Sequence, residues 1–330
     1  MAIIGFHASH EQIPPSALLQ HVQHAEQAGF AAAMCSDHLA PWSLRQGHSG
    51  HSWAWLGAAL ASTSLPFGVV TAPGQRAHPA VVAQAIATLG EMFPGRFWAA
   101  LGSGENVNEH VTGEPWPDKA TRERRLIESA DVMRRLLAGE EVSHSGEIVV
   151  DGARVWSRPP EPPPLIGAAV SPVSAASHAR WADGLITVAA DGPALRDVLT
   201  AYRDAGGRGP VSAQLHLSWA PDERDALAIA LDQWAYGTLG PPATWDIATP
   251  AEFDRRSVDV DEEAIRRAVT ISSDLAVHVA RVAEILDAGY DAVYLHHVGQ
   301  EQSAFIDAFG ERVLPALDRT LPGTTAAGDA

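Results

Sequence analysis

Short apolar runs alternate with longer amphipathic stretches along most of the chain. The short runs favour β-strands, and the stretches between them have the spacing of helices that bury one face. This alternation is typical of repeated strand–helix–strand units. The runs are IIGFHAS, AAAMCSD, PFGVVTAP, RFWAALGSG, PPLIGAAV, GLITVAA, VSAQLHLSW and DAVYLHHVG.

Eight such strands are the number that closes a parallel barrel, and the runs lack strict alternation, as expected when helices cover their outer side. The sequence therefore predicts a (β/α)8 TIM barrel, an α/β fold, as a single domain over residues 1–320. An open doubly wound sheet would need fewer strands and usually a glycine-rich first turn, which GFHASHEQIPPS does not supply. Helices are expected near 15–28, 55–62, 80–92, 118–138, 173–181, 193–205, 275–289 and 303–317.

Two stretches interrupt the alternation. Residues 141–156 contain Ser-Gly and Asp-Gly turn signals, which predict an inserted β excursion before the fifth strand. Residues 221–269 are too long and polar for one connection, so we expect a helical insertion or lid after the seventh strand. Residues 321–330 are expected to be disordered.

Charge and composition limit the classes of partner that this protein is expected to bind. The formal net charge of −17 argues against a role on nucleic acid or an anionic membrane, because no basic stripe offsets the repulsion. The N-terminus has no basic region typical of a signal peptide, and no run reaches transmembrane length, which predicts a cytoplasmic protein. Cys35 is the only cysteine and Lys119 the only lysine. An intramolecular disulfide is therefore impossible, and arginine and histidine are left to contact any anionic substrate.

Candidate chemistry lies where two strands end. The carboxyl ends of barrel strands face the active site. Asp37, His38 and Trp42 leave the second strand within SDHLAPW, and Glu105 and Asn108 follow two glycines after the fourth. A histidine and a carboxylate over one pocket suit general acid–base catalysis, or hydride transfer coupled to proton transfer. The spacing alone equally fits a helix-capping aspartate and a structural histidine.

Three segments resemble the luciferase-like flavin and deazaflavin oxidoreductases, most closely the glucose-6-phosphate dehydrogenase branch that uses coenzyme F420. The resemblance covers essentially the whole chain and is weakest over 221–269. It implies a hydride transfer between coenzyme F420 or FMN and a small organic substrate, with SDHxxPW favouring F420, and it implies a homodimer. The segments are SDHLAPW, AHPAVVAQAIATLGEMFPGRFWAALGSGENVNE and GYDAVYLHHVGQEQSAFIDAFGERVLPAL.

The same resemblance assigns roles to the residues at the strand ends. It places His38 at the reacting face of the cofactor, Trp42 in the same pocket, and Glu105 as the proton-transfer partner, so these three are the catalytic candidates. Which of His38 and Glu105 acts as acid and which as base stays open. Asp37 and Asn108 are implied to contact the cofactor.

The other cofactor candidates come from the ends of strands three, four and five. In the family, strand three ends in a bulge, often with a non-proline cis peptide, that supports the cofactor ring, and the helix N-terminus after strand five receives a phosphate. Two glycines after strand four let backbone approach a ligand. These segments supply Val69, Val70, Thr71, Gly104, Val170 and Ser171.

Substrate contacts are expected from Trp53, from His297 or its neighbour His296, and from Arg267. Only Arg267 falls near a basic position that relatives use for a sugar phosphate. We therefore expect a substrate other than a sugar phosphate.

Other function classes remain open from the sequence. The same fold supports FMN-dependent monooxygenases that need oxygen and a separate reductase. A metal-dependent barrel hydrolase that uses the histidines, and a catalytically silent barrel that binds a partner, are further alternatives. The histidine spacing fits no strong metal-ligand pattern, so no metal is predicted.

Overall fold

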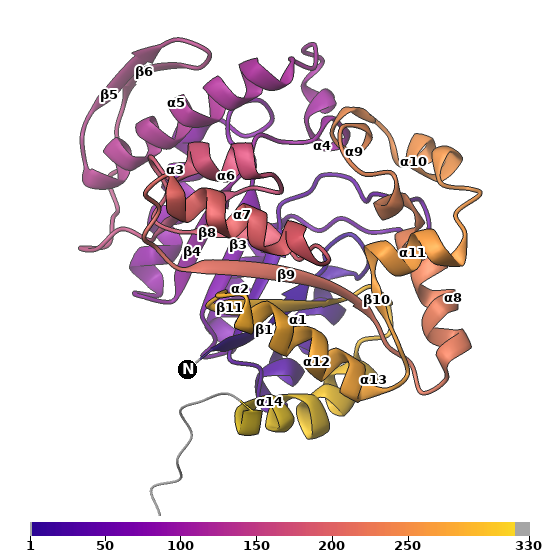
Figure 1. Cartoon of the computed structure of the whole chain (residues 1–330). Coiled ribbons are helices and arrows are strands. Elements are labelled where there is room, and N and C mark those ends of the chain that lie inside the picture. The colour runs from indigo at the N-terminus through magenta and orange to yellow at the C-terminus, as the bar shows by residue number, and fades with distance from the viewer. Residues whose placement is uncertain (1, 321–330) are drawn as a thin grey trace, which may run out of the picture.

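Parallel strands close into a barrel in the computed structural model, which describes residues 2–320 (Figure 1). Around the barrel the order is β1, β2, β3, β4, β7, β8, β9 and β11, and β11 pairs with β1 to complete the circle. The predicted (β/α)8 TIM barrel is therefore confirmed for the described residues. The strands are β1 (Ile3–Ala8), β2 (Ala32–Ser36), β3 (Phe67–Thr71), β4 (Phe97–Leu101), β7 (Leu165–Ala168), β8 (Leu185–Val188), β9 (Val211–Ser218) and β11 (Ala292–His297).

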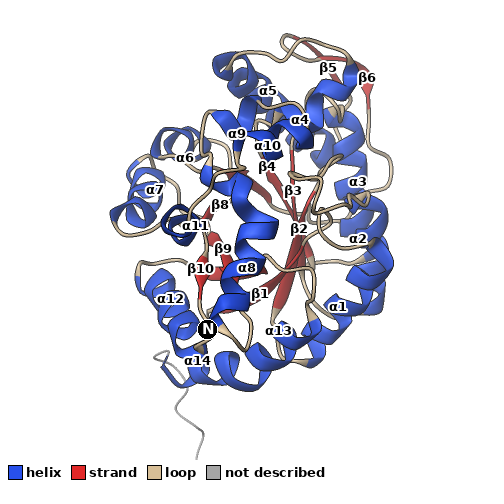
Figure 2. Ribbon diagram, turned by 90° about the vertical axis from the view of Figure 1, so that its right-hand side faces the viewer, coloured by secondary structure: helices blue, strands red, loops and turns tan. Residues whose placement is uncertain are grey.

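Helices surround the strands (Figure 2). Most begin close to the expected residue, but α2 begins at Ser52 rather than Trp55, because His51 caps it: its Nδ1 accepts a hydrogen bond from the Ala54 amide at 3.3 Å. The covering elements are α1 (Pro15–Gln27), α2 (Ser52–Ser62), α3 (Pro79–Met92), α4 (Asn106–Glu109), η1 (His110–Thr112), α5 (Lys119–Ala138), α6 (Pro172–His178), α7 (Pro193–Asp204), α12 (Leu275–Asp287), α13 (Ser303–Ala308), η3 (Phe309–Val313) and α14 (Leu314–Thr320).

Small residues make room for large rings inside the barrel. Gly68 faces the Trp98 ring, and Gly5 faces the ring of Tyr294, so a side chain at either glycine would overlap an aromatic ring. Trp98 and Tyr294 lie 5.8 Å apart between ring centroids. The interior below the strand ends is therefore a packed core, which leaves the strand ends themselves for a binding site.

Both expected insertions are present. The hairpin of β5 (Val142–Ser145) and β6 (Val149–Ala153) precedes β7, and its two strands pair antiparallel. After β9 the chain forms helices around a small apolar core that includes Phe253 and Ile265. These elements are α8 (Glu223–Trp234), η2 (Ala235–Thr238), α9 (Ala243–Asp246), α10 (Pro250–Arg256) and α11 (Glu262–Ala268), followed by the short strand β10 (Thr270–Ile271) beside β9.

Two other expectations concern the chain as a whole. None of the helices within residues 2–320 has both the length and the apolar character needed to span a bilayer. The expected disorder of residues 321–330 lies outside the described residues.

Candidate active site

A cavity of about 510 Å³ opens at the carboxyl ends of the barrel strands. One wall comes from β2, β3, β4 and the residues that follow them, and the opposite wall from β1, β9 and β11, while the ends of β7 and β8 line the cavity between β4 and β9. The insertion after β9 covers part of the opening. Of the residues predicted from the sequence, those that line the cavity are Asp37, His38, Trp42, Val70, Thr71, Gly104, Glu105, Asn108, Val170 and Arg267.

Asp37 is a buried anchor at the end of β2. Its Oδ1 accepts a hydrogen bond from Ser52 at 3.0 Å, and its Oδ2 accepts bonds from Trp53 Nε1 at 3.1 Å and Thr71 Oγ1 at 2.8 Å. Arg76 Nη2 also lies 3.1 Å from Oδ2. Burial alone would raise the pKa of Asp37, but the Arg76 charge and these hydrogen bonds outweigh it, and the pKa lies below its usual value. Asp37 is therefore held as a carboxylate that fixes the strand end.

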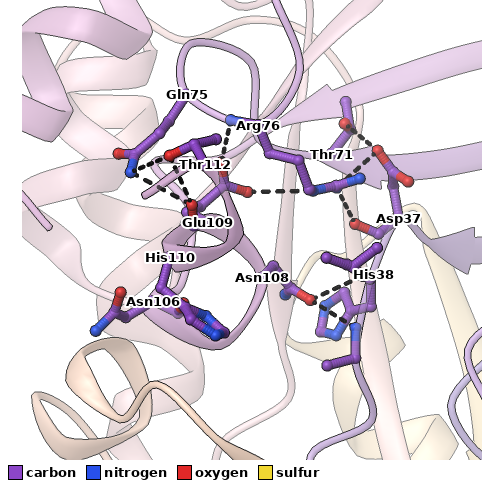
Figure 3. A network of polar contacts seen from close by, with 12 residues as sticks. Asp37, His38, Thr71, Gln75, Arg76, Asn106, Asn108, Glu109, His110 and Thr112 are labelled. Atoms are coloured by element: carbon purple, nitrogen blue, oxygen red, sulfur yellow. Dashed lines mark hydrogen bonds and ion pairs between the residues drawn. The ribbon is translucent and has the colours of Figure 1, made fainter. Parts of the chain in front are cut away.

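Asn108 tethers the SDHLAPW segment to α4. Its Oδ1 accepts hydrogen bonds from the amides of Leu39 at 2.9 Å and Ala40 at 3.3 Å, and Figure 3 shows it beside His38. These amides would otherwise lack a partner at a loop that leaves a buried strand. The two segments that carry His38 and Glu105 are thus joined directly.

Removing this tether should loosen the loop. Asn108→Ala leaves two backbone donors without their acceptor, so we expect the free energy of unfolding to fall by about 1–3 kcal/mol in urea denaturation. The matched control is Asn106→Ala on the same helix, whose amide donates instead to the backbone oxygen of Asp246. Equal losses in the two variants would contradict a special role for Asn108.

His38 meets a carboxylate that the sequence analysis missed. Its Nδ1 lies 3.3 Å from Glu11 Oε1, and both side chains are buried, at 10% and 5% exposed. Ser9 Oγ donates to the other Glu11 oxygen at 3.0 Å. Trp42 packs edge-on against His38 with ring centroids 5.0 Å apart and stacks on Tyr236. The His38 ring therefore lies within ion-pair distance of a buried carboxylate.

Glu105 and Glu109 place two carboxylates along the wall after β4. Glu105 is half-buried and precedes α4, whereas Glu109 is buried and ends it. Glu109 Oε2 accepts a hydrogen bond from the Arg76 amide at 2.7 Å. Burial raises the pKa of Glu109, and the nearby Glu105 adds to this rise, while Arg76 opposes it. Two carboxylates with different surroundings thus line one cavity.

The strand residues of the opposite wall, on β1, β9 and β11, carry polar but uncharged side chains. His7 and His296 stack with centroids 4.2 Å apart, and Gln214 Nε2 lies 2.9 Å from His296 Nδ1 and 3.3 Å from His216 Nε2. Gln12 Oε1 lies 2.9 Å from His296 Nε2. The Gln214 amide can donate to both rings, which makes His296 Nε2 the protonated nitrogen that donates to Gln12.

Burial keeps this wall neutral. Desolvation lowers the pKa of His216 to about 4, and it lowers the pKa of His7 and of His296 well below the usual value. Neighbouring imidazoles lower the pKa of His7 and His296 further. The three rings are therefore uncharged at neutral pH and offer hydrogen bonds rather than positive charge.

Positive charge comes from Lys119, Arg122 and Arg267, which also line the cavity. Arg122 is buried, whereas Lys119 and Arg267 are exposed and are the rim cations. Lys119 lies over the Trp245 ring at 5.1 Å, and Arg267 pairs with Glu263 at 2.6 Å.

Four predicted site residues lie outside the cavity lining. Val69 is fully buried and packs against the helices, on the outer face of β3, whereas Val70 faces the cavity. His297 stacks on Phe305 on the outer face of β11, so its neighbour His296 is the one that lines the cavity. Successive strand residues point to opposite faces, which explains both placements.

Ser171 and Trp53 are occupied by structural contacts. Ser171 caps α6, since its Oγ accepts from the Ser174 amide at 3.3 Å. Trp53 donates to Asp37 and otherwise packs in the core. The non-proline cis peptide implied for the end of β3 is also absent from the described residues, where the cis bond is Pro241–Pro242.

Several residues of the site were not predicted. Glu11 follows β1 by three positions, and the strand-end argument applied to β1 would have found it. Gln214 and His216 alternate on β9 and share a face, a signal that needs the strand's orientation to be read. Arg76 and Glu109 gave no signal of their own. No group of three His, Cys, Asp or Glu side chains suited to a metal occurs in residues 2–320.

Comparison with known proteins identifies the family of the chain. Residues 2–303 match the family model described as luciferase-like monooxygenase. An F420-dependent glucose-6-phosphate dehydrogenase of Nakamurella multipartita is 36% identical, with 97% of each chain covered. An F420-dependent hydroxymycolic acid dehydrogenase of Mycobacterium tuberculosis is 35% identical, covering 95% of this chain and 88% of the relative.

A solved structure extends the likeness to three dimensions. It is an F420-dependent secondary alcohol dehydrogenase in complex with an F420–acetone adduct, with a TM-score of 0.88, 30% identity, and coverage of 96% of this chain and 99% of that one. The family match over most of the sequence and the relatives that span it end to end agree with the resemblance found in the motifs. The chain belongs to the luciferase-like monooxygenase family of oxidoreductases.

Proposed function

We propose that this protein transfers a hydride between coenzyme F420 and the carbon of a small alcohol or carbonyl compound. The observation that carries the proposal is the convergence of His38, after β2, and Glu105, after β4, on one cavity. The family membership and the F420-dependent relatives support the choice of cofactor. FMN, which the sequence analysis kept open, is the alternative cofactor.

The cavity fits a flat deazaflavin ring. Val70, Ala72 and Ala169 present small apolar surfaces, and Gly104 has a φ of +83°, which favours glycine. A Cβ at Gly104 would lie 3.3 Å from both Ala72 Cβ and Glu109 Cγ. A side chain at this position would crowd both neighbours, so glycine lets the backbone pack closely against them. The small side chains of Val70, Ala72 and Ala169 leave room for a planar ligand along the lining.

The protein's own part is the transfer of a proton. When bound, the deazaflavin supplies a carbon that accepts or donates a hydride. An alcohol that loses a hydride from carbon also loses its hydroxyl proton, and His38 or Glu105 takes that proton; the reverse reaction returns it. If His38 takes it, the carboxylate of Glu11 is the group that faces the ring, 3.3 Å from Nδ1. The stacked rings of Trp42 and Tyr236 line the cavity beside His38.

The substrate's position follows from the two walls. The proposed proton-transfer pair lies near β2 and β4, so the substrate oxygen must reach that wall. The neutral wall of His7, His216 and His296 then meets the rest of the substrate and suits uncharged hydroxyl or carbonyl groups. The relatives named as glucose-6-phosphate dehydrogenases give no support to the expectation that sugar phosphates are excluded. The rim cations could receive a phosphate.

The cofactor proposal predicts a selective titration. We expect the purified protein to bind F420 at least tenfold more tightly than FMN in fluorescence titrations, because the protein resembles F420-dependent relatives over its whole length. Mass analysis of the small molecule released on denaturation identifies any cofactor retained from the cell. Tight binding of FMN alone would instead support the monooxygenase alternative.

The substrate proposal predicts F420 reduction by alcohols. Rates with propan-2-ol, glucose and glucose 6-phosphate, followed by loss of F420 absorbance, separate three substrate types. A preference for glucose 6-phosphate that disappears in Arg267→Gln would place the phosphate at the rim. Activity with the uncharged alcohols alone would support recognition by the neutral wall.

Three further statements remain proposals. We propose that residues 1–320 act as one domain, with residues 221–269 as a lid, since Gly240, Thr244 and Trp245 of that segment line the cavity. The homodimer is tested by light scattering in solution. The cytoplasmic location is tested by cell fractionation.

A further inference from the structure

We infer that Arg76 is a positioning residue that fixes the separation of His38 and Glu105, although it does not line the cavity. The inference rests on the proposed function for the roles of those two residues. Arg76 lies in the loop between β3 and α3 and is 15% exposed. Figure 3 shows it between Asp37 on one side and Glu109 on the other.

On the first side, the Arg76 side chain contacts Asp37, at the end of β2, through two of its oxygen atoms. Its Nη2 donates to the backbone oxygen of Asp37 at 2.8 Å and lies 3.1 Å from Asp37 Oδ2. The Asp37 side chain is 2% exposed. Because Asp37 directly precedes His38, these contacts fix the backbone from which the His38 side chain projects.

On the other side, Arg76 contacts the end of α4. The Arg76 backbone amide donates to Glu109 Oε2 at 2.7 Å, and its side-chain Nε lies 3.6 Å from Glu109 Oε1. The Glu109 side chain is 3% exposed. The Glu109 amide in turn donates to the Glu105 carbonyl at 3.2 Å, one helical turn earlier. Arg76 therefore acts on Glu105 through this turn.

The loop that carries Arg76 is itself anchored. Gln75 Nε2 donates to the Glu109 carbonyl at 3.4 Å and to Thr112 Oγ1 at 3.3 Å, while its Oε1 accepts from Arg125 at 2.9 Å. Because the loop is anchored, Arg76 can hold Asp37 and Glu109 at a fixed separation. In a mobile loop, Arg76 would only compensate their charge.

The geometry requires arginine rather than any cation. A guanidinium presents several donors in a rigid plane, so one side chain can contact the Asp37 backbone, the Asp37 carboxylate and Glu109 together. Within residues 2–320, Arg76 is the ion-pair partner of both buried carboxylates. Lysine would keep the charge but present a single nitrogen. The substitution Arg76→Lys therefore tests positioning separately from charge compensation.

Two measurements on Arg76→Lys and Arg76→Gln test the inference. We expect each variant to lower kcat at least tenfold, with KM and the F420 dissociation constant within about threefold of wild type. Hydrogen–deuterium exchange of the protein without ligands should rise in peptides that cover 37–46 and 104–112, and not in the rest of the barrel.

The matched control is Arg96→Gln. Arg96 donates to the backbone oxygens of Leu60, Thr63 and Leu65 at the other end of β4, and it touches neither Asp37 nor Glu109. We expect it to lower stability without lowering kcat tenfold or raising exchange in the two peptides.

Wild-type kcat in Arg76→Lys would overturn the inference, because it would show that charge alone is needed. Unchanged exchange in the two peptides would also overturn it. The exchange result needs no enzymatic assay, so it stands even if the protein shows no activity with F420, which would contradict the proposed function alone.

Discussion

Glu105→Gln is expected to lower kcat about 100- to 1000-fold while the F420 dissociation constant stays within about threefold. General acid–base catalysis contributes a factor of this size, and glutamine keeps the shape of the side chain but cannot exchange a proton. No hydrogen bond or ion pair holds the Glu105 carboxylate within the described residues, so the amide should fit without rearrangement. Steady-state kinetics of F420 reduction and a fluorescence titration measure the two quantities.

Glu114→Gln is the matched control, because Glu114 is exposed in the same connection and lies outside the cavity lining. It should keep wild-type kcat. A parallel loss of kcat and cofactor affinity in Glu105→Gln would show that Glu105 supports the binding site and takes no part in proton transfer.

The second large effect concerns stability in acid. We expect the free energy of unfolding to fall steeply from about pH 6.5 toward pH 4. Burial lowers the pKa of His10, His178 and His216 to about 4 and the pKa of His297 to about 3. Their folded pKa values lie below the unfolded value, so their stabilising contribution is present above pH 6.5 and is lost as the pH falls, when the unfolded chain binds protons first.

Each such histidine should contribute a slope of about 1.4 kcal/mol per pH unit in this window. Several together would exhaust a typical stability of about 5–15 kcal/mol before pH 4. Urea denaturation between pH 7.5 and pH 4.5 measures the slope. His178→Phe keeps a ring of similar size in the buried site. It should reduce the slope of unfolding free energy against pH by the contribution of one histidine, about 1.4 kcal/mol per pH unit. His110→Gln, at the surface, should leave the slope unchanged. A flat profile over this range would contradict the expectation.

The barrel was predictable because its strands repeat one simple pattern. Each strand is a short apolar run that ends in glycine or polar residues, and eight of them permit one closed parallel arrangement. The same rule placed His38 and Glu105 at the cavity, since His38 lies two residues after β2 and Glu105 lies four residues after β4. The location of residues just after a strand can be predicted without knowing which other segments pack beside them.

Residues within strands and loops were harder to place. Val69 and Val70 are adjacent and chemically identical, and His296 and His297 likewise, so only the orientation of the strand decides which one faces the cavity. Arg76 lies in a loop whose path depends on Asp37 and Glu109, which are 39 positions before it and 33 after it. Its role could not be read from local spacing.

The closure of the barrel also means that the two walls of the cavity form at different times during synthesis. The wall with His38 and Glu105 comes from contiguous chain, because β2, β3 and β4 pair in sequence order. The neutral wall joins both ends of the chain, since Ile3 pairs with Ala292. During synthesis from the N-terminus, the surface that meets the rest of the substrate can form only after β11 has left the ribosome. The proton-transfer wall can therefore assemble early, and the complete pocket is among the last features of the fold to form.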